Sequence, residues 1–254
     1  MSFIIALAGK GGTGKTTVAG LLVRALSERG DGPVLAIDAD ANDNLADARG
    51  MRREGTIAEV TDSFFTDRID LPAGMTKEAF LDMRLNTVIA EGRNIDMLIM
   101  GHPERAGCYC YINNVLRAQL EKLVGNYRYV VIDNEAGMEH ISRRTTRKLD
   151  VLLAVGDCSA KAIKAAGRIR KLASDLEIAV DRAGLVVNRV TAEGGAPEEE
   201  IAQTGLPLLA RIPESRVVRE NDIGGRPVFG LPGDDPVVAA VRELADTLTS
   251  AQRR

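Results

Sequence analysis

Short apolar runs alternate with segments of helical periodicity along most of this chain. The run Phe3–Ala8 has the length and composition of a buried strand, and the apolar residues of Val18–Leu26 recur at helical spacing. Further strand-like runs occur at residues 34–37, 95–100, 129–133, 150–155, 184–189 and 208–214. Helices are expected at residues 75–85, 113–125, 160–175 and 235–251. This alternation predicts one α/β domain with a doubly wound, mostly parallel sheet.

The chain shows no feature that would divide it into separate domains. It has 254 residues, and no internal repeat, low-complexity run or flexible linker interrupts them. We therefore expect a single domain spanning residues 1–254. The sequence predicts least for residues 51–91, since only one helix is expected there and no chemistry is assigned to it.

A glycine-rich segment joins the first expected strand to the first expected helix. Gly9, Gly14, Lys15 and Thr16 satisfy the phosphate-loop pattern G-x-x-x-x-G-K-T. Backbone N–H groups of such a loop surround the β-phosphate, and the helix N-terminus adds partial positive charge. Lys15 is expected across the β- and γ-phosphates of ATP, and the Thr16 hydroxyl on Mg²⁺. The residues expected to bind ATP or ADP here are Gly9, Lys10, Gly11, Gly12, Thr13, Gly14, Lys15, Thr16 and Thr17.

Acidic residues follow two of the expected strands. Because ligands of open α/β sheets collect at the carboxyl ends of strands, these acids should face the phosphates. Asp133 ends one apolar strand and is expected to hold Mg²⁺ through water. Asp40 is the first candidate to orient the attacking water, while Asp38 shares that role or binds a Mg²⁺ water. The alternative is that Asp38 and Asp40 cap the next helix.

Two cysteines stand one residue apart in a Pro- and Gly-rich segment at about residues 101–112. The thiolates of Cys108 and Cys110 favour a soft or borderline metal. Two ligands rarely complete a site, but a two-fold homodimer supplies two more. Four thiolates suit Zn²⁺ when tetrahedral and Ni²⁺ when square-planar. A redox pair, or two packed thiols, remains the alternative from these residues alone.

Charge and composition argue against several kinds of partner. Net charge is −3 and aromatic residues make up 4%, so we expect neither a nucleic-acid nor an anionic-membrane partner. Residues 251–254 are too short to form a membrane-targeting helix, and the apolar N-terminus is expected as a core strand, not a signal peptide. An odd count of three cysteines beside an ATP site favours the cytoplasm.

Lys10 makes the phosphate loop more specific. A second lysine directly after Gly9 gives the pattern K-G-G-x-G-K-T, which resembles the deviant phosphate loop of the MinD/ParA/nitrogenase-iron-protein family of P-loop ATPases. The resemblance implies that ATP closes a homodimer, in which Lys10 reaches the partner's phosphates, and that hydrolysis reopens it. Lys10, Lys15, Asp38, Asp40 and Asp133 are then the catalytic candidates. The same family pattern places Gly137 at the γ-phosphate, Asn188 and Arg189 at the adenine, and Pro213 in the purine-side loop.

The cysteine pair narrows the resemblance. Gly107–Cys110, the following 114–117, and the stretch Asp133–His140 are similar to the CooC-type maturation ATPases of nickel carbon monoxide dehydrogenase and to the related accessory ATPase of acetyl-CoA synthase. The resemblance implies a homodimeric metallochaperone with nickel, or zinc, between Cys108 and Cys110 of two protomers. Its client would be apo carbon monoxide dehydrogenase or acetyl-CoA synthase. Alternatives are an iron–sulfur electron donor and a MinD/ParA-type positioning ATPase.

Overall fold

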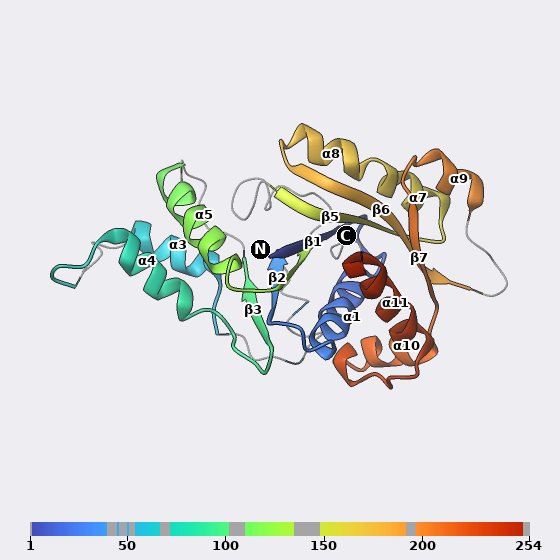
Figure 1. Cartoon of the computed structure of the whole chain (residues 1–254), viewed down its shortest axis with the longest axis horizontal. Helices are drawn as coiled ribbons and strands as arrows, with labels where there is room; N and C mark the ends of the chain where they lie inside the picture. Colours follow the sequence, from blue (N-terminus) through green and yellow to red (C-terminus); the bar gives the residue numbers. More distant parts are fainter. Residues whose placement is uncertain are drawn as a thin grey trace.

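The centre of the molecule is a seven-stranded sheet in which every strand pair is parallel, with the order β3-β2-β4-β1-β5-β6-β7 (Figure 1). The computed structural model describes residues 2–39, 45, 50, 54–66, 72–101, 110–134, 148–191 and 197–250, without the side chains of 64–66 and 110–114. The strands are β1 (Phe3–Ala8), β2 (Val34–Ala39), β3 (Ile95–Ile99), β4 (Tyr129–Asn134), β5 (Lys148–Asp157), β6 (Ala179–Val190) and β7 (Leu208–Pro213). The predicted doubly wound parallel sheet is confirmed.

Helices cover both faces of this sheet. One face packs against α1 (Lys15–Glu28), α10 (Arg216–Ile223), the short 3-10 helix η1 (Val228–Gly230) and α11 (Pro236–Ser250). The other face carries α3 (Ile57–Thr66), α4 (Lys77–Asn86), α5 (Cys110–Val124), α7 (Ala160–Gly167), α8 (Ile169–Asp175) and α9 (Glu198–Gln203). No helix among the described residues is long and apolar enough to cross a membrane.

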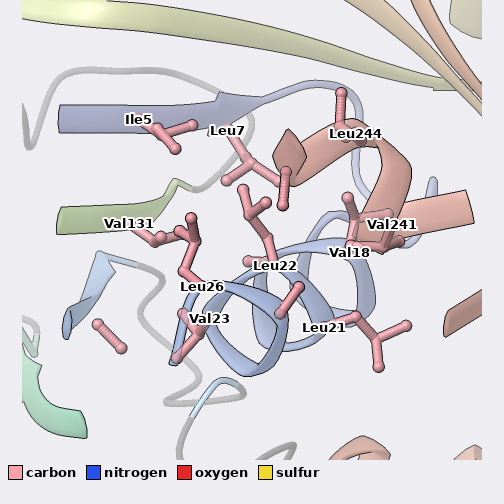
Figure 2. Packing of buried hydrophobic residues seen from close by; sticks show 14 of the residues in the cluster. Ile5, Leu7, Val18, Leu21, Leu22, Val23, Leu26, Val131, Val241 and Leu244 are labelled. Carbon is pink, nitrogen blue, oxygen red and sulfur yellow. The ribbon is translucent and has the colours of Figure 1, made fainter. Parts of the chain in front are cut away.

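The core on the α1 face follows from the spacing of apolar residues in α1. Leu22 and Leu26 are fully buried and are directed toward Leu7 of β1 and Val131 of β4 (Figure 2). Burying one leucine of this kind stabilises the fold by about 1.5–3 kcal/mol. Leu244 of α11 packs on the same cluster, so the helix that follows the phosphate loop is fixed from two sides.

Besides α9 and α10, for which no helix was expected, two local features differ from the sequence prediction. The single helix expected over 160–175 is two helices, because the backbone at Arg168 turns between α7 and α8. The helix α3 was not expected, although its start carries a sequence signal. Thr56 and Glu59 form reciprocal bonds, in which the Glu59 N–H donates to Thr56 Oγ1 at 3.0 Å and the Thr56 N–H donates to Glu59 Oε2 at 2.9 Å. This capping box is readable as T-x-x-E.

Candidate functional site

The phosphate loop lies between the end of β1 and the start of α1, where the sequence predicts it. Gly9 packs so closely on β5 that a Cβ atom there would overlap the Val155 carbonyl oxygen. Gly12 and Gly14 have φ values of 83° and 85°, a region that suits glycine. Gly14 is also the residue that precedes the first turn of α1, so the helix N-terminus opens directly into the loop.

Lys10 and Lys15 take different places in this loop. The side chain of Lys10 is exposed, while Lys15 is 8% exposed. The Lys10 carbonyl oxygen accepts a bond from Thr13 Oγ1 at 2.9 Å and from Lys15 Nζ at 3.3 Å. The second of these bonds holds the Lys15 ammonium across the loop, whereas the Lys10 side chain is exposed to solvent. The arrangement fits one lysine for the protomer's own phosphates and one available to a partner.

Asp38 and Asp133 lie beside the loop on adjacent strands. They are paired in register across β2 and β4, and they are 0% and 1% exposed. Side chains alternate along a strand, and both residues share the face of Ala36 and Val131, which α1 covers. Asp38 Oδ2 accepts the Leu45 N–H at 2.7 Å. Through this bond, the Asp38 side chain is connected to Leu45 in the segment that follows β2.

The oxygen donors at this edge fit a hard divalent cation. Carboxylates and hydroxyls are the ligands that Mg²⁺ prefers, and Asp133, Asp38 and the Thr16 hydroxyl supply both. Thr16 is the second residue of α1, and α1 packs against β4. The donor set is therefore suited to Mg²⁺, which would screen the phosphate charge when nucleotide is bound.

A hollow next to the loop gathers the residues expected on the adenine side. It is lined by Thr17, Asn188, Arg189, Pro213, Glu214, Ser215, Val218, Arg219, Asp222 and Val237. Asn188 Nδ2 donates to the Thr13 carbonyl at 2.9 Å, and Arg189 Nη1 donates to the Gly12 carbonyl at 3.1 Å. Arg219 and Asp222 were not anticipated. They come from α10, whose start is marked by Ser215, which accepts the Val218 N–H at 3.3 Å.

Four predicted site residues fall outside what the structure describes. Asp40, Cys108 and Gly137 lie outside the described residues, and of Cys110 only the backbone is described, as the first residue of α5. The described residues contain no group of three or more His, Cys, Asp or Glu side chains that could hold a metal ion. Binding of metal by Cys108 and Cys110 thus stays a prediction.

The third cysteine, Cys158, lies beside Arg189 at the end of β6. Burial raises the pKa of its thiol above the ordinary value, which disfavours the thiolate. Its Sγ lies 3.4 Å from the Arg189 carbonyl oxygen. Cys158 is thereby a half-buried neighbour of the end of β6.

Comparison with known proteins also indicates a nucleotide-binding domain over most of the chain. Residues 4–228 match the family described as the CobQ/CobB/MinD/ParA nucleotide binding domain. An uncharacterized ATP-binding protein of Methanocaldococcus jannaschii is 38% identical over 248 residues, which cover 96% of this chain and 98% of that protein. The carbon monoxide dehydrogenase accessory protein CooC of Rhodospirillum rubrum is 35% identical over 185 residues, 68% of this chain and 70% of that protein.

Solved structures agree at the level of the fold. The cell division ATPase MinD of Pyrococcus furiosus superposes with a TM-score of 0.71 over 99% of this chain and 100% of that one, at 24% identity. The family match covers most of the chain, and it includes the loop in which Gly14 and Lys15 stand as nucleotide binding requires. The chain therefore belongs to the CobQ/CobB/MinD/ParA family of nucleotide-binding domains and is a P-loop ATPase.

Proposed function

We propose that this ATPase is a homodimeric, cytoplasmic metallochaperone that carries nickel between the Cys108 and Cys110 pairs of two protomers and assists its insertion into carbon monoxide dehydrogenase. The observation that carries the proposal is the 35% identity to the accessory protein CooC, in a chain that itself has the C-x-C pair. Zn²⁺ can occupy the same thiolates, since sulfur ligands suit both metals.

The sheet provides a physical route between nucleotide and metal. The Met100 N–H, directly after β3, donates to the Asp38 carbonyl at 2.8 Å, and the segment that contains both cysteines starts just beyond, at Gly101. Asp38 also binds the Leu45 N–H through its side chain. We expect a change at Asp38 on ATP binding to reach the start of the cysteine segment through the bond from Met100. Nucleotide and metal affinity are then coupled reciprocally.

The nucleotide cycle uses the remaining candidates. Lys15 neutralises the β- and γ-phosphates, while the exposed Lys10 reaches the nucleotide of the partner and makes the dimer depend on ATP. Thr16 and Asp133 hold Mg²⁺, and Asp40, with Asp38, orients the attacking water. Gly137 contacts the γ-phosphate through its N–H, and Asn188 and Pro213 lie beside the adenine. Hydrolysis then resets the dimer.

Anaerobic titration of Ni²⁺ into chelator-treated protein tests the metal function. Thiolate-to-metal charge-transfer absorbance and native mass are followed with and without a non-hydrolysable ATP analogue. We expect one nickel per dimer, lost in Cys108→Ala/Cys110→Ala and altered by the analogue. Cys158→Ala is the matched control, which should keep the metal because Cys158 lies beside Arg189. Tight ATP binding without a cysteine-dependent metal site would overturn the proposal.

The client enzyme requires a separate experiment, because acetyl-CoA synthase is the alternative client. Each nickel-free enzyme is incubated with the loaded dimer, MgATP and a chelator that removes free nickel. We expect activation of carbon monoxide dehydrogenase, and not of acetyl-CoA synthase, to require ATP hydrolysis. Activation of acetyl-CoA synthase alone would reassign the client while leaving the metal carrier in place.

A further inference from the structure

The end of β6 has an unusual backbone at Arg189. Its φ is 57°, a left-handed value that is uncommon for a residue with a side chain. The pairing of β6 with β7 also shifts register between Val187 and Val190. Strained backbone and strand irregularities of this kind concentrate at functional sites, where they redirect a side chain. The strain at Arg189 directs its guanidinium to the phosphate loop and not along the sheet.

Asn188 and Arg189 bind two consecutive peptide groups of that loop. Arg189 Nη1 donates to the Gly12 carbonyl at 3.1 Å, and Asn188 Nδ2 donates to the Thr13 carbonyl at 2.9 Å. In a trans peptide the C=O and the following N–H point in opposite directions. Holding these two carbonyls toward β6 therefore directs the N–H groups of Thr13 and Gly14 to the opposite side, into the loop. Such N–H groups are the donors that a phosphate-binding loop offers.

The neighbouring atoms keep both side chains against the loop. A Cβ atom on Gly14 would overlap Asn188 Nδ2 and would lie 3.9 Å from Arg189 Nε, so only glycine admits this contact. Asn188 is 6% exposed and lines the hollow on the adenine side. Cys158 Sγ lies 3.4 Å from the Arg189 carbonyl oxygen. The pair thus connects the adenine side to the phosphate side of one site.

We propose that Arg189, together with Asn188, is a positioning residue for the phosphate loop, which aims the Thr13 and Gly14 amides at the β-phosphate of the nucleotide. For Arg189, this role at the phosphate loop replaces the place at the adenine that was expected from the sequence. The proposal rests on nucleotide binding by the family loop and does not depend on the metal function. It predicts that Arg189 contributes to the binding of nucleotides that have a β-phosphate and contributes little to AMP.

Calorimetric affinities for ADP and AMP test this role in Arg189→Ala. A charged donor on a partly solvated carbonyl corresponds to about a 5- to 10-fold change in affinity. We expect ADP to bind about 5- to 10-fold more weakly in this variant, and AMP to change by less than about twofold. An equal loss for both ligands would mean that Arg189 acts on the base or ribose, and no loss for either would mean that it acts on neither. Both results overturn the proposal.

Two further variants separate positioning from folding and from general charge. Arg189→Gly removes the guanidinium but accepts the left-handed backbone without strain, so it should show the same selective loss of ADP with an unfolding free energy that is unchanged or higher. Full ADP affinity in Arg189→Gly would contradict the proposal. Arg219→Ala removes another cation of the same hollow and should change AMP and ADP by the same factor. A selective loss of ADP there would attribute the effect to charge alone and would also contradict it.

Discussion

Asp38 and Asp133 stand in register on neighbouring strands, and both carboxylates are buried on the face of the sheet that α1 covers. Burial of negative charge is unfavourable unless a cation compensates for it. We expect bound Mg²⁺ to act as this cation when nucleotide is present, so Asp133→Asn should reduce the rise in unfolding free energy that MgADP gives by about 1 kcal/mol. The same substitution removes the Mg²⁺ ligand that we propose and should slow Mg²⁺-dependent hydrolysis by on the order of 100-fold. Urea unfolding and steady-state ATPase rates measure the two effects.

Asp150→Asn is the control for a carboxylate outside the site. Asp150 Oδ2 accepts the Ile4 N–H at 2.7 Å, at the start of β5. This variant should lose about 1 kcal/mol of stability and keep its hydrolysis rate, because it weakens a hydrogen bond and removes no Mg²⁺ ligand. Unchanged Mg²⁺-dependent hydrolysis in Asp133→Asn would remove Asp133 from the metal site.

The close approach of Gly9 to β5 predicts a large difference between two glycines of one loop. In Gly9→Ala the new Cβ overlaps the backbone carbonyl of Val155, which cannot move aside without disturbing the sheet. We expect a loss of about 2–3 kcal/mol in unfolding free energy. Gly11 has open space around it, so Gly11→Ala should stay within about 0.5 kcal/mol of the natural protein. Equal stabilities of the two variants in urea would contradict this packing.

The separate places of the two loop lysines predict separate effects of removing them. Lys15 is buried beside the loop carbonyls, so Lys15→Ala should weaken MgADP binding by about 10-fold or more. The Lys10 side chain is exposed, so Lys10→Ala should keep the MgADP affinity within about twofold and lose the ATP-dependent dimer that we propose. Light scattering with a non-hydrolysable ATP analogue measures the dimer. A normal ATP-dependent dimer in Lys10→Ala would contradict its reach to a partner.

The sheet and the phosphate loop were predictable because local sequence decides them. The apolar run Phe3–Ala8 is a strand with the expected bounds, the other runs are strands whose ends differ from the prediction by one to five residues, and the glycine spacing placed Lys15 at the start of α1. The helix α10 was not predicted, because none of its residues is buried and the sequence therefore has no apolar stripe there. Its Arg219 and Asp222 reach the hollow only through the tertiary position of α10.

Contacts between residues that are far apart along the chain could not be predicted from the sequence. Asp38 was expected near the phosphates, but its bond to the Leu45 N–H depends on the path of the chain after β2. Likewise, the residue types Asn188 and Arg189 do not predict the left-handed backbone that the structure has at Arg189. That conformation is adopted because the bonds to the loop carbonyls stabilise the strained strand end.

Tyr127 gives the fold a stability that depends on alkaline pH. Its hydroxyl donates to Asp96 Oδ2 at 2.8 Å, and burial, then this bond, raise the phenol pKa above its ordinary value of 10.0. The folded state thus holds the proton more tightly, so the contribution is complete below pH 10 and declines as the pH rises toward the raised pKa. Tyr127→Phe should cost about 1 kcal/mol at pH 8 and progressively less above pH 10. Urea unfolding between pH 8 and 11 measures this, with Asp96→Asn expected to lie between the two proteins because it keeps an acceptor without the charge. Parallel pH profiles for the natural protein and Tyr127→Phe would show that the phenol proton is not linked to folding.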